Sequence, residues 1–161
     1  MSTRLLIVFL SVAVGTLCGY IVFLSYKRNY TYLGGVCDML SALKQNLAYK
    51  KDTVPVVLSG MTISNALLKK NIDEYIAYTA GQSDKREVSR GFLPQSTFDG
   101  VNDLFAAIGG SDENSQSARL DALELRFDKL LADAERKYTK YGSVAVKLGF
   151  LVGLGVGVLV L

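Results

Sequence analysis

The chain has 161 residues, of which 50% are hydrophobic and 20% charged, and its formal net charge is +3. It contains no histidine and only two cysteines, which excludes imidazole-based catalysis and leaves most zinc or copper sites out of reach of this chain alone. No basic stripe is interleaved with aromatic residues, so the sequence does not indicate a nucleic-acid-binding protein.

The first predicted element is a membrane-spanning helix. Residues 5–24 (LLIVFLSVAVGTLCGYIVFL) form an uncharged apolar run that matches about 30 Å of bilayer hydrocarbon. Tyr26, Lys27 and Arg28 follow it, which is typical of a membrane interface. A secretory signal is the alternative, but its apolar core is shorter and it ends at a cleavage site. We therefore expect residues 1–26 to be a retained transmembrane helix.

Both cysteines fall in this helix or shortly after it. Cys18 and Cys37 would lie about 28 Å apart along a continuous helix, too far for a disulfide. We expect each to serve as a small buried apolar side chain.

Residues 27–140 are predicted to form a helical bundle. Apolar residues at three- and four-residue steps predict a helix that runs on from the first span and ends before Pro55. Gly34 and Gly35 weaken its early turns. The apolar positions of this helix are Leu33, Val36, Leu40, Leu43 and Leu47.

Two further helices are predicted in the next part of the chain. Apolar residues from Ile63 to Thr79 predict a second helix, which Gly81 closes. The polar stretch SDKREVSR, residues 83–90, predicts a short third helix before Gly91.

The next helix is predicted from its ends. Ser96, followed by Asp99 three residues later, resembles a capping box and marks the start. Gly109 and Gly110 mark the end.

The last helix is predicted to run unbroken from about residue 112 into the C-terminal span. Ser111 suits its cap, and Asp112 and Glu113 suit the positive end of its dipole. No strand-like alternation competes, so the fold class is all-α, with a cytoplasmic bundle between two transmembrane helices. A heptad-like stripe follows through Gln116, Leu120, Leu123, Phe127, Leu130, Ala134, Lys137 and Tyr141.

The C-terminal span is predicted over residues 141–161. The apolar run from Leu148 is too short to cross a bilayer alone, but extension back to Tyr141 makes it long enough. Lys147 then lies inside the span, near enough to its end to reach the interface. A buried or re-entrant helix is the alternative.

Small residues recur at four-residue steps in both spans. This spacing places them on one helix face, where another backbone can approach closely. The sequence leaves open whether the two faces pack on each other, on a second copy or on a different subunit, so a homo-oligomer is one outcome. The residues are Ser11, Gly15, Gly19, Gly149, Gly153 and Gly157.

Basic residues flank the two spans on their inner sides. Positive flanks mark the cytoplasmic side of a membrane, which predicts a cytoplasmic middle segment and both termini outside. We therefore assign a role as membrane-interface anchors to Lys27, Arg28, Arg136, Lys137, Lys140 and Lys147.

The sequence contains no recognisable catalytic or nucleotide-binding motif. The sequence lacks a Walker-type loop, GxSxG, HExxH and any Cys–His pairing. Asp112 and Glu113 are a possible acid pair, but helix capping explains them better. We therefore assign no catalytic, cofactor-binding or metal-binding residue and do not expect an enzyme.

Two segments carry a resemblance to a known family. LFAAIGGSDENSQ (104–116) and KYTKYGSVAVKLGFLVGLGVGVLVL (137–161) resemble the stage III sporulation protein AB family. The family usually has Leu where this chain has Gly109, and residues 52–95 match poorly beyond Pro55. The most specific matches are Gly109, Gly110, Ser111 and Asp112 with Gln116, and Lys147, Leu148 and Gly149 with Gly153.

This resemblance implies a mother-cell membrane protein in an endospore-forming bacterium. It implies a subunit of the transenvelope channel to the forespore, with a cytoplasmic domain similar to the F-type platform of type II secretion. The implied partners are the secretion-type ATPase of that channel (sporulation protein AA), other membrane subunits and membrane lipid. The sequence therefore predicts a non-enzymatic platform subunit.

Two other classes of function stay open at this stage. A membrane-anchored regulator or sensor would use the same helical domain to bind a signalling protein. A membrane enzyme is a third class, which no residue in the sequence specifically favours.

Overall fold

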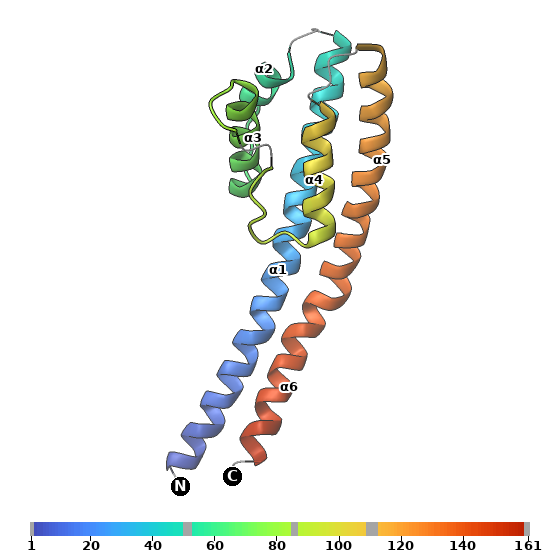
Figure 1. The fold of residues 1–161 in the computed structure, drawn as a ribbon. Coiled ribbons are helices and arrows are strands. Elements are labelled where there is room, and N and C mark those ends of the chain that lie inside the picture. Colours follow the sequence, from blue (N-terminus) through green and yellow to red (C-terminus); the bar gives the residue numbers. More distant parts are fainter. Residues whose placement is uncertain (1, 50–52, 85–86, 109–112, 160–161) are drawn as a thin grey trace. The chain divides into compact units, whose positions relative to one another are not determined.

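The computed structural model describes residues 2–49, 53–84, 87–108 and 113–159 (Figure 1). Every regular element in these residues is helical and none is a strand, which confirms the all-α prediction. The elements are α1 (Ser2–Tyr49), α2 (Val54–Ser59), α3 (Ala66–Thr79), α4 (Gln95–Ile108), α5 (Glu113–Lys137), the π-helical turn η1 (Tyr138–Gly142) and α6 (Ser143–Leu159).

The chain forms two compact units. Unit 1 comprises Met1–Tyr30 and Asp133–Leu161, and unit 2 comprises Thr31–Ala132. Helices α1 and α5 each contribute to both units, because the boundaries fall inside them.

Unit 2 is a helical bundle around a core of large apolar side chains. Because α1, α3, α4 and α5 are each amphipathic here, they bury their apolar faces together. One polar pair lies inside: the Asn71 amide nitrogen donates to the Tyr32 hydroxyl at 2.8 Å. The fully buried side chains include Tyr32, Leu33, Val36, Leu40, Leu43, Leu68, Ile72, Val101, Leu104 and Phe127.

Helix α1 passes through Gly34 and Gly35 without a break. At Gly35 the reason is close packing, since a Cβ there would lie 2.9 Å from Leu68 Cδ2 of α3. The missing side chain therefore lets α1 and α3 approach, which offsets the low helix propensity of glycine.

Helix α3 begins later than the apolar pattern predicted. Residues 61–65 are not helical, and Asn65 caps α3 by accepting from the backbone nitrogens of Leu67 and Leu68 at 3.1 and 3.2 Å. The separate short helix α2 precedes this segment and carries Pro55 in its first turn, where the missing N–H costs nothing.

The predicted helix over residues 83–90 is wrong, with residues 85–86 outside the described residues. The segment is held instead by side chains of its neighbours: Ser89 N donates to Glu74 of α3 at 2.7 Å, and Val88 N donates to Asn102 of α4 at 3.2 Å. Val88 and Leu93 are buried. These tertiary bonds satisfy the backbone donors that a local helix would otherwise use.

The capping box predicted at Ser96 is also wrong. Helix α4 begins at Gln95, and the Pro94 carbonyl accepts from Thr97 N and Phe98 N at 3.1 and 2.9 Å. Asp99 instead accepts from the Gln95 side chain at 2.8 Å. The predicted stop at residues 109–110 and the predicted cap at residues 111–112 lie outside the described residues.

The last helical stretch contains one π-helical turn, which the sequence did not predict. Because a π turn holds more residues than an α turn, the inward-facing positions shift. Tyr138 is half-buried and Gly142 is buried, whereas Lys137 and Tyr141, which we had placed on the apolar stripe, are exposed.

Candidate functional site

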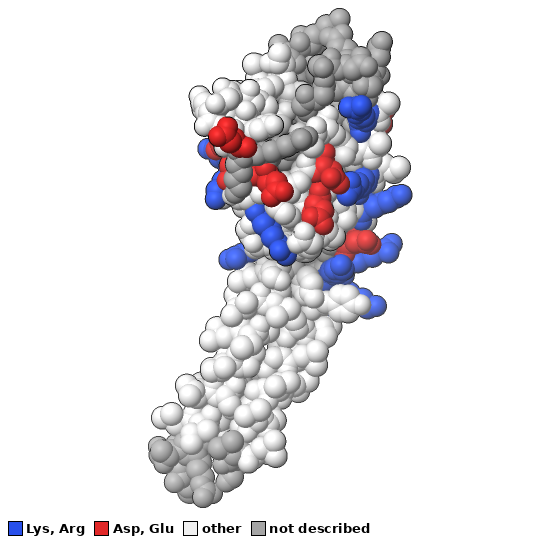
Figure 2. Space-filling view, viewed as in Figure 1, with Lys and Arg blue, Asp and Glu red and all other residues white. Residues whose placement is uncertain are grey.

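Unit 1 contains the parts of the chain suited to a membrane. The described chain has two helices long and apolar enough to cross a bilayer, within Leu6–Asn46 and Ala118–Leu159. Below the band of charged residues in Figure 2, the described part of the two apolar helices shows no Lys, Arg, Asp or Glu on the face in view. Exposed large apolar side chains include Leu6, Phe9, Leu10, Leu17, Ile21, Leu151, Val152 and Leu159. These features fit a membrane protein.

The small residues of the two spans meet each other in an antiparallel glycine seam, defined by Ser11, Gly15 and Gly19 on α1 and Gly149, Gly153 and Gly157 on α6 (Figure 1). At Gly15, an added Cβ would collide with the Gly149 carbonyl oxygen. At Gly153 it would lie 2.7 Å from the Ser11 carbonyl oxygen. The backbones of α1 and α6 therefore touch within one chain, one of the arrangements that the sequence left open.

A hydroxyl group reinforces the seam. Ser11 Oγ lies 3.1 Å from the Gly153 carbonyl oxygen and 2.8 Å from the Val8 carbonyl oxygen of its own helix. The hydroxyl proton can therefore be shared between the two helices, a contact that small residues permit in an apolar environment.

The seam is not uniformly tight. Neighbours of Gly15, Gly19, Gly149 and Gly153 are mainly backbone atoms, whereas an added Cβ at Gly157 would meet the Ser11 and Val8 side chains. Gly155, two residues away, has nothing within 4 Å of its added Cβ. Glycine is thus required by packing on one face of α6 and not on the other.

An aromatic cluster continues the contact beyond the seam. The rings of Phe23 and Tyr30 lie 5.5 and 5.6 Å from the ring of Tyr138, and Tyr20 stacks on Phe23 at 6.0 Å. Gly142 makes room for this cluster, because a Cβ there would lie 3.0 Å from Phe23 Cδ2. The π turn thus faces α1 through aromatic rings.

The predicted interface anchors are exposed on the helices around this aromatic cluster. We define the basic collar as Lys27, Arg28, Arg136, Lys137 and Lys140. Lys140 Nζ lies 5.7 Å from the ring of Tyr141, a cation–π contact. Lys147, also exposed, follows Gly142 by five residues, about 7.5 Å along the helix, so its long side chain can reach back toward the collar.

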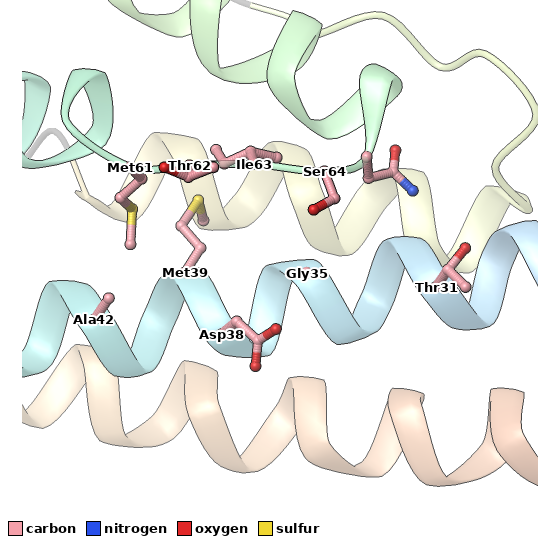
Figure 3. A pocket seen from close by; sticks show the side chains of 10 residues that line it. Thr31, Gly35, Asp38, Met39, Ala42, Met61, Thr62, Ile63 and Ser64 are labelled. Atoms are coloured by element: carbon pink, nitrogen blue, oxygen red, sulfur yellow. The ribbon is translucent and has the colours of Figure 1, made fainter.

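Unit 2 presents a pocket of about 520 Å³ between α1 and the extended segment before α3 (Figure 3). Two methionines from the two walls, Met39 and Met61, give it an adaptable apolar lining, and Asp38 supplies its one acidic side chain. The lining residues are Thr31, Gly35, Asp38, Met39, Ala42, Met61, Thr62, Ile63, Ser64 and Asn65.

Ion pairs join α1 to α5 on the surface of unit 2. Lys44 Nζ lies 2.6 Å from Asp121 and 2.9 Å from Glu124. The hydrogen bonds that the Lys44 ammonium donates to these carboxylates, to Asp121 first, raise the pKa of Lys44 above its usual range. Both ion pairs are on the surface, so they add little stability.

The two cysteines differ from each other. Burial first, and then the nearby charge of Asp128, raise the pKa of the Cys37 thiol to about 11, which keeps it protonated near neutral pH. The expected burial of Cys18 is wrong: it is exposed, on an outer surface of unit 1 where sulfur suits an apolar environment. Among the residues that the structure describes, no group of three or more metal-ligating side chains could hold an ion.

A comparison with protein-family models matches residues 4–161 to the stage III sporulation protein AB family. The chain belongs to this family. Membership confirms the resemblance to this family and gives the protein a role in sporulation, in a family not known as one of enzymes. Searches of curated proteins and of solved structures found no match.

The family motif of this stage III sporulation protein AB member is only partly visible. Gly109, Gly110, Ser111 and Asp112 lie outside the described residues. Gln116 belongs to α5, and its side chain is likewise outside them. The sequence prediction for this motif therefore stays a prediction.

Sequence reasoning missed the residues that join the collar to the seam. These are Phe23, Tyr30, Tyr138 and Gly142. Two signals were present: Phe23 continues the four-residue spacing of Gly15 and Gly19, and Gly142 precedes Gly149 by seven residues, two helical turns. In this member of the sporulation family the packed face of unit 1 thus extends past its small residues.

Proposed function

We propose that this protein is a non-enzymatic platform subunit of the transenvelope channel between mother cell and forespore. It would reside in the mother-cell membrane with unit 2 in the cytoplasm. The supporting observation is the family match over residues 4–161 in a chain that pairs two membrane-compatible helices with a helical unit.

The charge distribution supports this orientation. The collar residues lie on the side of both apolar runs that leads to unit 2, and positive flanks favour the cytoplasmic side. Unit 2, in turn, holds the buried side-chain core of the protein.

The chain path supports a role in transmitting movement. The chain enters unit 2 within α1 and leaves it within α5, in helix rather than in a loop. A helix keeps its backbone hydrogen bonds internal and is stiffer than an irregular linker. A subunit that receives movement from a cytoplasmic motor and passes it to membrane parts needs such connections.

The partner that we propose for unit 2 is the secretion-type ATPase of the channel, sporulation protein AA. Other membrane subunits of the channel would contact the outer faces of unit 1, because the glycine seam is already filled within the chain. The seam would then keep the two spans together as one body while those faces remain available.

Site-specific photocrosslinking in sporulating cells tests this proposal. The photoreactive residue replaces one exposed position at a time on unit 2: Thr62 beside the pocket, Lys69 on α3, Ala106 on α4 and Leu125 on α5. The matched control is Leu151 of α6, exposed on unit 1. We expect the ATPase in adducts from at least one unit 2 position and from none at Leu151.

Two outcomes would contradict the proposal. One is a kinase, a phosphatase or another signalling protein as the consistent partner of unit 2, which would favour a membrane-anchored regulator. The other is the absence of ATPase adducts at all four positions while a known channel subunit crosslinks at Leu151.

A further inference from the structure

The two units carry opposite balances of charge. Unit 1 has seven basic residues and two acidic ones, Asp133 and Glu135, whereas unit 2 has eleven basic and thirteen acidic residues. Five of the seven basic residues of unit 1 form the collar, in the short segments 27–28 and 136–140. The excess positive charge of the protein is therefore concentrated in a small part of unit 1.

Packing brings these two segments to the same level of unit 1. Tyr30 of α1 stacks on Tyr138 of η1 with ring centroids 5.6 Å apart, and Phe23 lies 5.5 Å from the same ring. Lys27 and Arg28 lie between Phe23 and Tyr30 along α1, and Lys137 and Lys140 flank Tyr138. The cations of both helices therefore lie at the level of an aromatic contact along unit 1, with their side chains exposed.

The collar adjoins the lipid-compatible surface of the same unit. Tyr20 and Ile21 on α1 and Val144 and Leu148 on α6 are exposed within a few residues of it. A polar headgroup layer begins where the hydrocarbon ends and is about 5–7 Å deep on each side. Side chains of lysine and arginine placed there reach phosphate groups, and tyrosine favours the same depth.

We propose that the basic collar binds the phosphate groups of anionic phospholipids, which form a partly ordered ring around the paired helices. The geometry favours lipid over an acidic protein segment, because the cations come from both helices and border exposed apolar side chains. Lys147, deeper in α6, adds a contact to the same headgroups. The inference rests on the membrane placement of unit 1 and is independent of the proposed ATPase partner.

The test is a measurement of lipid preference for the full chain in bilayers. The chain is reconstituted in phosphatidylcholine vesicles, and electron paramagnetic resonance gives the association of spin-labelled phosphatidylglycerol relative to spin-labelled phosphatidylcholine. We expect a several-fold preference for phosphatidylglycerol that declines as salt is added, because each exposed cation near a membrane surface contributes roughly a fivefold effect.

Three variants test whether the lipid preference depends on the collar residues or on positive charge anywhere in the protein. The triple variant Lys27→Gln, Arg28→Gln, Lys140→Gln removes three of the five collar charges and should remove most of the preference, while Arg136 and Lys137 retain the remainder. Exchange at the same positions, Lys27→Arg, Arg28→Lys and Lys140→Arg, keeps the charges and should keep the preference. The control Lys69→Gln, Lys70→Gln removes two exposed charges from α3 of unit 2 and should change nothing. Circular dichroism verifies that each variant keeps its helix content.

Three results would overturn the proposal. The first is a preference near one in the unchanged protein. The second is an equal loss in the collar variant and in the Lys69, Lys70 control. The third is loss of the preference when inorganic phosphate replaces chloride at equal ionic strength, which would mark a site for soluble anions and not for lipid.

Discussion

The two units of this protein are both helical, yet they pack by opposite means. Unit 1 joins α1 to α6 through missing side chains, so that backbone meets backbone at Gly15, Gly149 and Gly153. Unit 2 fills its interior with large side chains such as Tyr32 and Phe127. A bilayer supplies no hydrophobic driving force between helices, so close backbone contact suits the membrane placement proposed for unit 1, whereas burial from water favours the packing of large side chains in unit 2.

This contrast predicts that the two units respond oppositely to a change in side-chain size. Removal of atoms should damage unit 2 and leave unit 1 largely intact. Addition of atoms should damage the seam of unit 1.

The largest effect is expected from Phe127→Ala in unit 2. Phe127 is fully buried, so its removal should cost about 3–5 kcal/mol of the free energy of unfolding. Urea titration of the full chain in mild detergent, followed by circular dichroism, measures this loss. The control Leu125→Ala changes a neighbour that is 60% exposed and should have a small effect. Equal losses in the two variants would contradict the assignment of the core.

The next effect is expected from Gly153→Leu in unit 1. The new side chain would meet the backbone of Ser11 and Val12, so α1 and α6 must separate, at a cost of about 1–3 kcal/mol. Disulfide formation between cysteines introduced at opposing seam positions measures helix pairing, and it should fall.

The matched control is Gly155→Leu, on the open face of the same helix. It should leave pairing unchanged, and neither variant should alter the urea titration of unit 2. If both leucine variants reduced pairing to the same degree, a specific seam would be ruled out.

A smaller effect is expected from alkaline pH. Burial raises the pKa of Tyr32 from 10.0 to about 12. The unfolded chain therefore loses the Tyr32 phenol proton at lower pH than the folded chain. The stability that follows from this difference in pKa is fully present below pH 10. This stability is lost as the pH rises from about 10 to 12, up to about 3 kcal/mol.

The variant Tyr32→Phe isolates this contribution. It cannot ionise at this position, so its stability should fall less steeply between pH 10 and 12 than that of the unchanged protein. At neutral pH it should be less stable, by about 1–3 kcal/mol, because the Asn71 amide loses its partner. Parallel slopes for the two proteins in urea titrations across this pH range would argue against a buried phenol.

The smallest effect is expected from Lys44→Gln. Its ion pairs with Asp121 and Glu124 are exposed, so the urea midpoint should move only slightly at low salt. The difference should vanish in high salt, which screens surface charges. A large shift that persists in high salt would show that this contact is more than a surface pair.

The sequence predicted much of unit 1 because its signals are local. Run length predicts the two membrane spans, and four-residue spacing marks the small-residue faces of Gly15 and Gly153. The partner of each face was not predictable, because a helix face looks the same whether it meets its own chain or another. The π turn at Tyr138–Gly142 was missed because it shows only as a one-residue shift in the packed stripe.

Unit 2 was predictable in its helices and less so between them. Apolar periodicity identified the core positions Leu33, Val36 and Leu40. The helix predicted from the polar stretch at residues 83–90 did not form, because backbone donors there bond to the side chains of Glu74 and Asn102, which are distant in the sequence. Tertiary partners of this kind override local propensity.

The packing of unit 1 depends on the pairing of α1 and α6 through the glycine seam within one chain. Spin labels at Val14 and Val152, which are exposed and adjacent to seam glycines, test it by double electron–electron resonance in bilayers, with Cys18 and Cys37 replaced by alanine. We expect a single short distance between the two labels that persists when labelled chains are diluted with unlabelled ones. Loss of that distance on dilution would show that the seam joins different chains, and a broad distribution from the outset would show that there is no seam.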